Sequence, residues 1–154
     1  VAGTPTNKKV TIGEYANALN APVSLADSSI SLTEATHAGR ICITPDCSAD
    51  RTWTLPTPIA GMTFRFVGPI GLAAADGHDV IIAAGTGNSI FFKGQVVHLD
   101  TNADNVTVFS DQNSNETLQF NVPSAYDITL VGISATIWMV SGWVCSTTAP
   151  AFAD

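Results

Sequence analysis

Short apolar runs at a regular spacing constrain this chain of 154 residues more than any other feature of its sequence. From residue 28 onward, apolar or β-branched runs recur about every ten residues and are separated by Gly, Pro, Asn, Asp and Ser. No stretch there repeats apolar residues with a helical period. The pattern predicts an all-β fold: a single antiparallel β-sandwich or jelly roll, or a small β-barrel.

Alternation within the runs assigns side chains to faces, because successive side chains of a strand point to opposite sides. Apolar residues at every second position predict inward-facing rows in two of the runs: Met62, Phe64 and Phe66 in the first, and Leu118, Phe120 and Val122 in the second. Residues 133–140 differ, since both faces of that run are nearly apolar. Such a strand is either central to a two-layer core or packed against another chain. Trp138 and Val140 are accordingly candidate partner-binding residues, and Ser141-Gly142 is predicted to turn the chain into the next strand.

The chain divides into an extended N-terminal arm (residues 1–27), a β domain (28–146) and a C-terminal tail (147–154). The arm contains Pro5, Pro22 and small residues, with at most one or two helical turns near residues 14–19. Lys8 and Lys9 make the start of the arm basic, whereas residues 10–154 hold 4 basic and 13 acidic residues, a net charge of −9. A basic terminus on an acidic body is typical of interaction tails, and a frayed, solvated terminus is the alternative.

Composition excludes two classes of partner. The formal net charge is −7, and six basic residues along an acidic chain cannot build a surface that binds nucleic-acid phosphates. No apolar run reaches the roughly 18 residues of a membrane helix. Only 12% of residues are charged while 45% are hydrophobic. This balance predicts that other subunits cover part of the surface.

No group of residues predicts catalysis, a cofactor or a metal site. Nucleophile elbows, phosphate-binding loops and dinucleotide fingerprints are absent. Three histidines lie in separate segments without metal-ligand spacing: His37, His78 and His98. Asp100 and Asp111 stand at the ends of a possible calcium loop, but Asn105 occupies the sixth position, where the sharp turn needs Gly. An ordinary Asx-rich hairpin loop is therefore favoured, with calcium as the alternative.

The three cysteines, an odd number, favour reduced thiols over a disulfide scaffold. Cys42 and Cys145 each lie in an apolar run, where a free cysteine behaves as a small hydrophobic residue. A Cys42–Cys47 bridge across the intervening turn is the alternative.

Several segments resemble small all-β structural proteins of tailed bacteriophages. Residues 52–56 read TWTLP and residues 61–66 read GMTFRF, similar to a TLP block followed by G-x-x-F-x-F in those proteins. The resemblance continues through GHDVI at residues 77–81 and a late tryptophan-bearing strand near residues 138–142, and covers about residues 28–145. The group includes capsid decoration (cement) proteins and β modules of tail fibres.

The resemblance implies a virion protein on the capsid exterior, made in the host cytoplasm, that binds the major capsid protein. Decoration proteins of this kind usually form homotrimers and clasp the shell with a terminal arm. Candidate partner-binding residues in the arm are accordingly Lys8, Lys9, Val10, Ile12, Tyr15 and Leu19. The alternative is a receptor- or carbohydrate-binding module of a tail fibre or adhesin, using Trp53 or Trp143. A long arm and the lack of a glycine-repeat or coiled-coil stalk favour the capsid.

Overall fold

A computed structural model describes residues 11–68, 77–100 and 105–154. Its first sheet, sheet A, consists of β1 (Val23–Ser24), β3 (Ile41–Ile43), β5 (Thr63–Gly68), β7 (Phe91–Asp100), β8 (Val106–Phe109), β10 (Ala125–Ser134) and β11 (Ile137–Ser146). Its second, sheet B, consists of β2 (Ile30–Ser31), β4 (Arg51–Thr54), β6 (Val80–Ala83), β9 (Thr117–Phe120) and β12 (Ala151–Ala153). The helices are α1 (Ile12–Asn20) and α2 (Glu34–His37).

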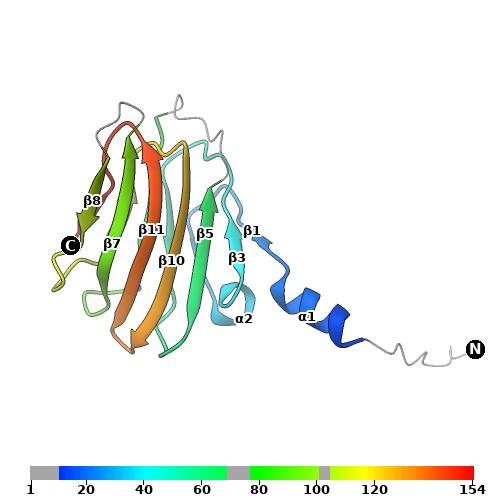
Figure 1. Cartoon of the computed structure of the whole chain (residues 1–154). Helices are drawn as coiled ribbons and strands as arrows, with labels where there is room; N and C mark the ends of the chain where they lie inside the picture. Colours follow the sequence, from blue (N-terminus) through cyan, green and yellow to red (C-terminus); the bar gives the residue numbers. More distant parts are fainter. Residues whose placement is uncertain (1–10, 69–76, 101–104) are drawn as a thin grey trace, which may run out of the picture.

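The two sheets pack face to face, which confirms the predicted all-β sandwich (Figure 1). Sheet A has the strand order β1-β3-β5-β10-β11-β7-β8 and sheet B the order β12-β9-β6-β4-β2. The described strands do not close into a barrel. β1, in the predicted arm, pairs with β3, and β12, in the predicted tail, pairs with β9. Both segments belong to the β domain.

The first half of the chain winds between the two sheets. In sheet A, β1, β3 and β5 are parallel neighbours, and in sheet B so are β2, β4 and β6. In each sheet, every strand of this half therefore lies beside the previous strand of the same sheet. In sheet B this arrangement places Ile30, Trp53 and Ile82 in one row. The prediction of an antiparallel sandwich is wrong here, since both sheets are mixed. Side chains alternate between the two faces in parallel and in antiparallel strands alike. The alternation in the sequence therefore does not specify the direction of the neighbouring strand.

The second half contributes the longest strands. β10 and β11, each ten residues long, form an antiparallel hairpin that turns at Ala135 and Thr136. β11 continues through Ser141-Gly142, so the predicted turn there is wrong. Gly142 has a φ of 139° and lies against the Asp127 carbonyl of β10, where a Cβ atom would collide. The glycine therefore permits close approach of two strands instead of a change of direction.

Aromatic side chains join the two sheets in the core. The predicted inward rows are confirmed by the burial of Phe64, Phe66, Leu118 and Phe120, while Met62 packs partly buried at the edge of the core. Trp53 of sheet B stacks on Phe66 of sheet A with ring centroids 6.2 Å apart. Phe64 and Trp138 make an edge-to-face contact with ring centroids 5.6 Å apart. Aromatic contacts of this kind add to the stabilisation from buried apolar area.

Two buried indoles differ in their hydrogen bonding. Trp138 Nε1 donates to the carbonyl oxygen of Ala84 at 3.0 Å, a bond between β11 and the residue that follows β6. Trp53 is equally buried, but its Nε1 has no hydrogen-bond partner among the residues that the structure describes. A hydrogen bond made in the core contributes to stability, whereas an unpaired buried donor costs free energy.

Replacing each indole by phenyl separates these effects. We expect Trp138→Phe to lower the free energy of unfolding by about 1 kcal/mol more than Trp53→Phe, because only the first leaves a buried carbonyl unpaired. Both variants lose ring volume, so each controls for the cavity in the other. Urea denaturation followed by circular dichroism measures the difference. Equal losses would show that the Trp138–Ala84 bond does not contribute.

Candidate functional site

α1 projects from the sandwich as an arm (Figure 1). A capping box begins this helix: Thr11 Oγ1 accepts from the Glu14 backbone N–H at 3.1 Å, and Glu14 Oε2 accepts from the Thr11 N–H at 2.8 Å. In the described part of the arm, nine residues are helical. The predicted arm was extended, with at most one or two helical turns, so the helix is longer than predicted. The T-x-x-E pattern was the available sequence signal.

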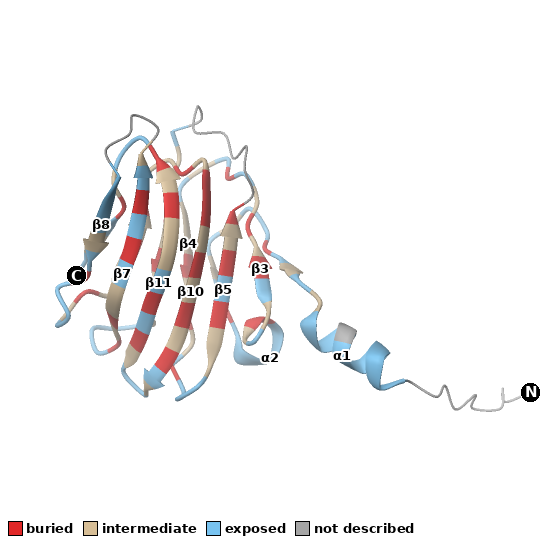
Figure 2. Cartoon of the chain, viewed as in Figure 1, coloured by how far each residue is buried: buried red, intermediate tan, exposed pale blue. Residues whose placement is uncertain are grey.

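Three large apolar side chains form a stripe along α1, here called the arm stripe. Ile12 is 90% exposed, Tyr15 62% and Leu19 55%. Their spacing of three and four residues places them on one face of the helix. Every α1 side chain that the structure describes is exposed (Figure 2). Since short helices depend mainly on packing for stability, an uncovered stripe of this size indicates a surface for a partner.

A guanidinium group connects α1 to the body of the protein. Arg40 Nη2 donates to the carbonyl oxygen of Ala18 in the last turn of α1 at 3.2 Å, and its Nη1 donates to Thr36 at 3.1 Å. A positive charge at the carbonyl end of a helix also interacts favourably with the helix dipole. Arg40 therefore helps to fix the orientation of α1 relative to the sandwich.

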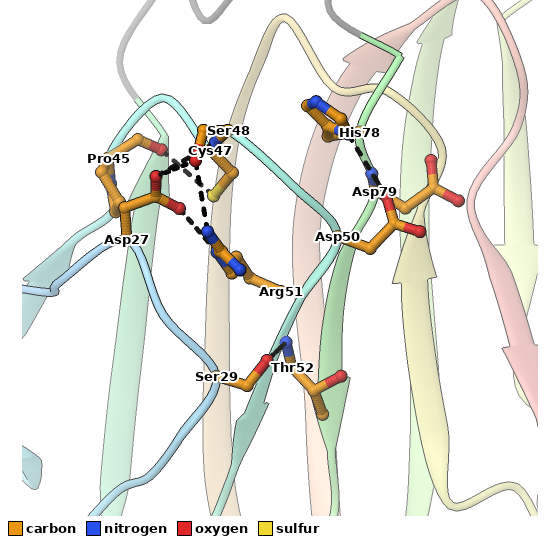
Figure 3. Close-up of polar contacts among 10 residues, drawn as sticks. All are labelled: Asp27, Ser29, Pro45, Cys47, Ser48, Asp50, Arg51, Thr52, His78 and Asp79. Carbon is orange, nitrogen blue, oxygen red and sulfur yellow. Dashed lines mark hydrogen bonds and ion pairs between the residues drawn. The ribbon is translucent and has the colours of Figure 1, made fainter.

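A polar cluster holds the segment after β1 against the loop before β4 (Figure 3). Asp27 accepts from Arg51 Nε at 2.6 Å and from Ser48 Oγ at 2.6 Å. The Arg51 guanidinium, followed by the Ser48 hydroxyl, holds the pKa of the Asp27 carboxyl well below its usual range. Ser29 Oγ accepts from the Thr52 N–H at 3.0 Å and extends the connection along β4. These contacts fasten the base of the arm, and the apolar patterns of the sequence did not reveal them.

Neighbouring carboxylates also bind backbone groups (Figure 3). Asp50 Oδ1 accepts from the Asp79 N–H at 2.9 Å and lies 3.8 Å from His78 Nδ1. The Asp79 carboxylate accepts from Gln119 Nε2 at 2.6 Å and from the Val122 N–H at 3.0 Å. Among the described residues, no group of three His, Cys, Asp or Glu side chains could hold a metal ion. These carboxylates connect turns to strand ends.

Two alternatives from the sequence concern the possible calcium loop and the possible Cys42–Cys47 bridge. Asp111 Oδ1 accepts from the backbone N–H groups of Asn113 and Ser114, which lowers the pKa of this carboxyl and forms an Asx loop. Residues 101–104 of the possible calcium loop lie outside the described residues. All three cysteines are free thiols, so the alternative Cys42–Cys47 bridge is not formed.

The predicted partner-binding residues fall into three groups. Ile12, Tyr15 and Leu19 form the arm stripe. The residues 8–10 (Lys8, Lys9 and Val10) lie outside the described part of the chain.

Trp138 and Val140 form the third group, and their prediction is corrected. Both are buried inside the sandwich, so neither can contact a partner. β11 is an inner strand of sheet A and directs these side chains toward sheet B. The opposite face of β11 points outward and carries Met139 and Trp143.

No protein-family model matches the chain, and no curated protein matches it. Neither described helix combines the length and the apolar character that crossing a membrane requires.

The Asp27–Arg51 contact predicts a pH dependence of stability. The folded-state pKa of Asp27 is lowered, so its contribution is fully present above the unfolded pKa of about 3.9 and is lost as pH falls through the folded value. We expect Asp27→Asn to lower the Tm at neutral pH and the difference from the native chain to shrink steadily below about pH 4. Thermal melts across this range measure the effect. Glu34→Gln, at an exposed position of α2, is the control. A difference for Asp27→Asn that does not change with pH would contradict the prediction.

Proposed function

We propose that this chain is a capsid decoration protein: a non-enzymatic virion protein that binds the major capsid protein on the exterior of a phage head. The arm stripe is the observation that carries the proposal, since a capped helix presents Ile12, Tyr15 and Leu19 outside the sandwich. The resemblance of residues 28–145 to phage structural proteins supports the same conclusion. The protein would be made in the host cytoplasm and act as a homotrimer.

An amphipathic helix binds by placing its apolar face in a groove of the partner. Full burial of a large aliphatic or aromatic side chain stabilises by roughly 1.5–3 kcal/mol, so the arm stripe could supply several kcal/mol. The capping box preorganises α1 and reduces the entropy lost on binding. Lys8 and Lys9 add positive charge to the arm of an otherwise acidic chain. Three arms engaged together would raise the avidity by orders of magnitude.

Decoration stabilises a shell by mass action. A protein that binds adjacent shell subunits only in their assembled arrangement lowers the free energy of that arrangement and not of the separate subunits. The shell then resists loss of subunits more strongly as the concentration of decoration protein rises. This mechanism requires a rigid body and a projecting binding segment, and it needs no catalytic group.

The arm stripe is tested by truncating its side chains. We expect Ile12→Ala combined with Leu19→Ala to weaken binding to undecorated shells by at least about tenfold, because two exposed apolar contacts are lost. Co-sedimentation of the protein with emptied phage heads over a concentration series measures the occupancy. Ile59→Ala is the matched control, since Ile59 is 55% exposed like Leu19 but lies outside α1. Unchanged occupancy of the double variant would refute the arm as the binding segment.

The tail-fibre or adhesin alternative depended on exposed tryptophans. Trp53 is buried in the core, which leaves the half-buried Trp143. Saturable binding on a glycan array that is lost in Trp143→Ala would favour this alternative over decoration. We expect no such binding, because the Asp127 carboxylate beside Trp143 is already bound by the Arg65 guanidinium and Val97 lies on the other side of the indole.

A further inference from the structure

The outward-facing side of sheet A, here called the sheet A face, is unusually apolar. Sheet A lies in front in Figure 2, where exposed and half-buried positions alternate with buried ones along its strands. Large exposed apolar side chains come from four of these strands: Ile41, Val97, Leu99, Ile133 and Met139. Trp143 lies half-buried among the same outward positions of β11.

Strand register groups the apolar side chains of this face into two patches, which are separated by a polar row of Ser141, Thr129 and Arg65. Trp143 is paired with Val97 across β11 and β7, and Cys145 is paired with Leu99 one row further along. At the other end of β11, Met139 is paired with Val131 of β10. Paired residues on one face have Cβ atoms about 5 Å apart, close enough for their side chains to touch. The apolar residues thus form two patches, one at each end of β11, instead of isolated positions.

The outer face of sheet B provides an internal comparison. Its outward positions are mostly polar or small: Ser31, Thr52, Thr54, Ala83, Thr117, Gln119, Ala151 and Ala153. Ile81 is a large apolar exception. A sandwich face in contact with water normally carries polar residues, as sheet B does. The composition of the sheet A face is therefore that of a covered surface.

Charges on the sheet A face favour a second copy of this chain as the cover. Arg65 Nε and Nη2 donate to the two carboxylate oxygens of Asp127 at 2.8 and 2.5 Å, so this pair is satisfied within one chain. Lys93, at an outward position of β7, is a further charged residue on this face. Residues 10–154 have a net charge of −9, yet this face carries no net negative charge. Two acidic bodies can therefore meet there without burying an unpaired acid.

The area of the sheet is sufficient for a stable contact. Three of its strands have ten residues and are about 33 Å long. Seven strands at a spacing of about 4.8 Å extend about 29 Å across the sheet. Allowing for the shorter edge strands, the face measures on the order of 700 Å². Each partner of a standard protein interface contributes roughly 800 Å².

We infer that copies of this chain associate through the sheet A face. The inference rests on the proposed function in that it names the surface by which the proposed homotrimer would form. It also relocates the partner contacts of β11 from Trp138 and Val140, which are buried, to Met139 and Trp143 on the opposite face.

The oligomeric mass of the full chain tests this inference. We expect sedimentation equilibrium to give a multiple of 16.0 kDa for the native chain. Met139→Lys and Leu99→Lys, on different strands, should each weaken association by at least tenfold and give a 16.0 kDa species at the same concentration. Ile59→Lys replaces an exposed apolar residue outside the face and should leave the mass unchanged. Circular dichroism and the Tm establish that each variant is folded.

Cys145 reports whether the sheet A face is the covered surface. Its side chain points outward beside Leu99, whereas Cys42 and Cys47 are buried. Burial raises the pKa of Cys42 to about 11 and raises that of Cys47, so both thiols should react slowly at neutral pH. We expect Cys145 to react slowly with a thiol reagent in the native oligomer and several-fold faster in Met139→Lys.

Three results would overturn the inference. They are a monomeric native chain at about 100 μM, an oligomer that persists in folded Met139→Lys and Leu99→Lys, and rapid Cys145 labelling in the oligomer. Co-sedimentation with phage heads tests the proposed function independently of this inference. An oligomer that is disrupted by face substitutions but ignores phage heads would refute decoration and support the sheet A face as the contact between copies.

Discussion

The aromatic contact between the two sheets determines the rest of this structure. Trp53 projects from sheet B onto Phe66 of sheet A, and Phe64 of sheet A makes an edge-to-face contact with Trp138 from the same layer. These rings fill the space between the layers and leave little freedom for a strand to slip in register. A slip by one residue would move each ring to the outer face, at the cost of its buried area.

Once the rings occupy the interior, the outer faces follow by alternation. The same strand of sheet A that buries Trp138 must present Met139 and Trp143 on the other side. In sheet B the outward positions are polar or small, and in sheet A many are apolar. The two proposals therefore use different surfaces: α1 for the shell, and the sheet A face for a second copy. The side chains that each proposal uses lie outside the buried core.

How much could be predicted differs between the core and the surface. The inward rows at Phe64 and Phe66, and at Leu118 and Phe120, follow from period-two alternation because one strand face meets the core and the other does not. The same reasoning failed for residues 133–140, where both faces are apolar and alternation does not distinguish them. α1 was underestimated because its stability signal is the capping box at Thr11, a local hydrogen-bond pattern and not an apolar one.

The sequence by itself determined the strand class, the inward rows and the start of the arm helix, because each depends on interactions between residues close along the chain. Only the tertiary structure decided the parallel stacking of β1, β3 and β5, the burial of Trp138 and the exposure of Met139. These features depend on which layer lies against which face, and that is settled by packing between segments far apart in the chain. The contact of Arg40 with α1 belongs to the same class, since it joins residues 22 positions apart.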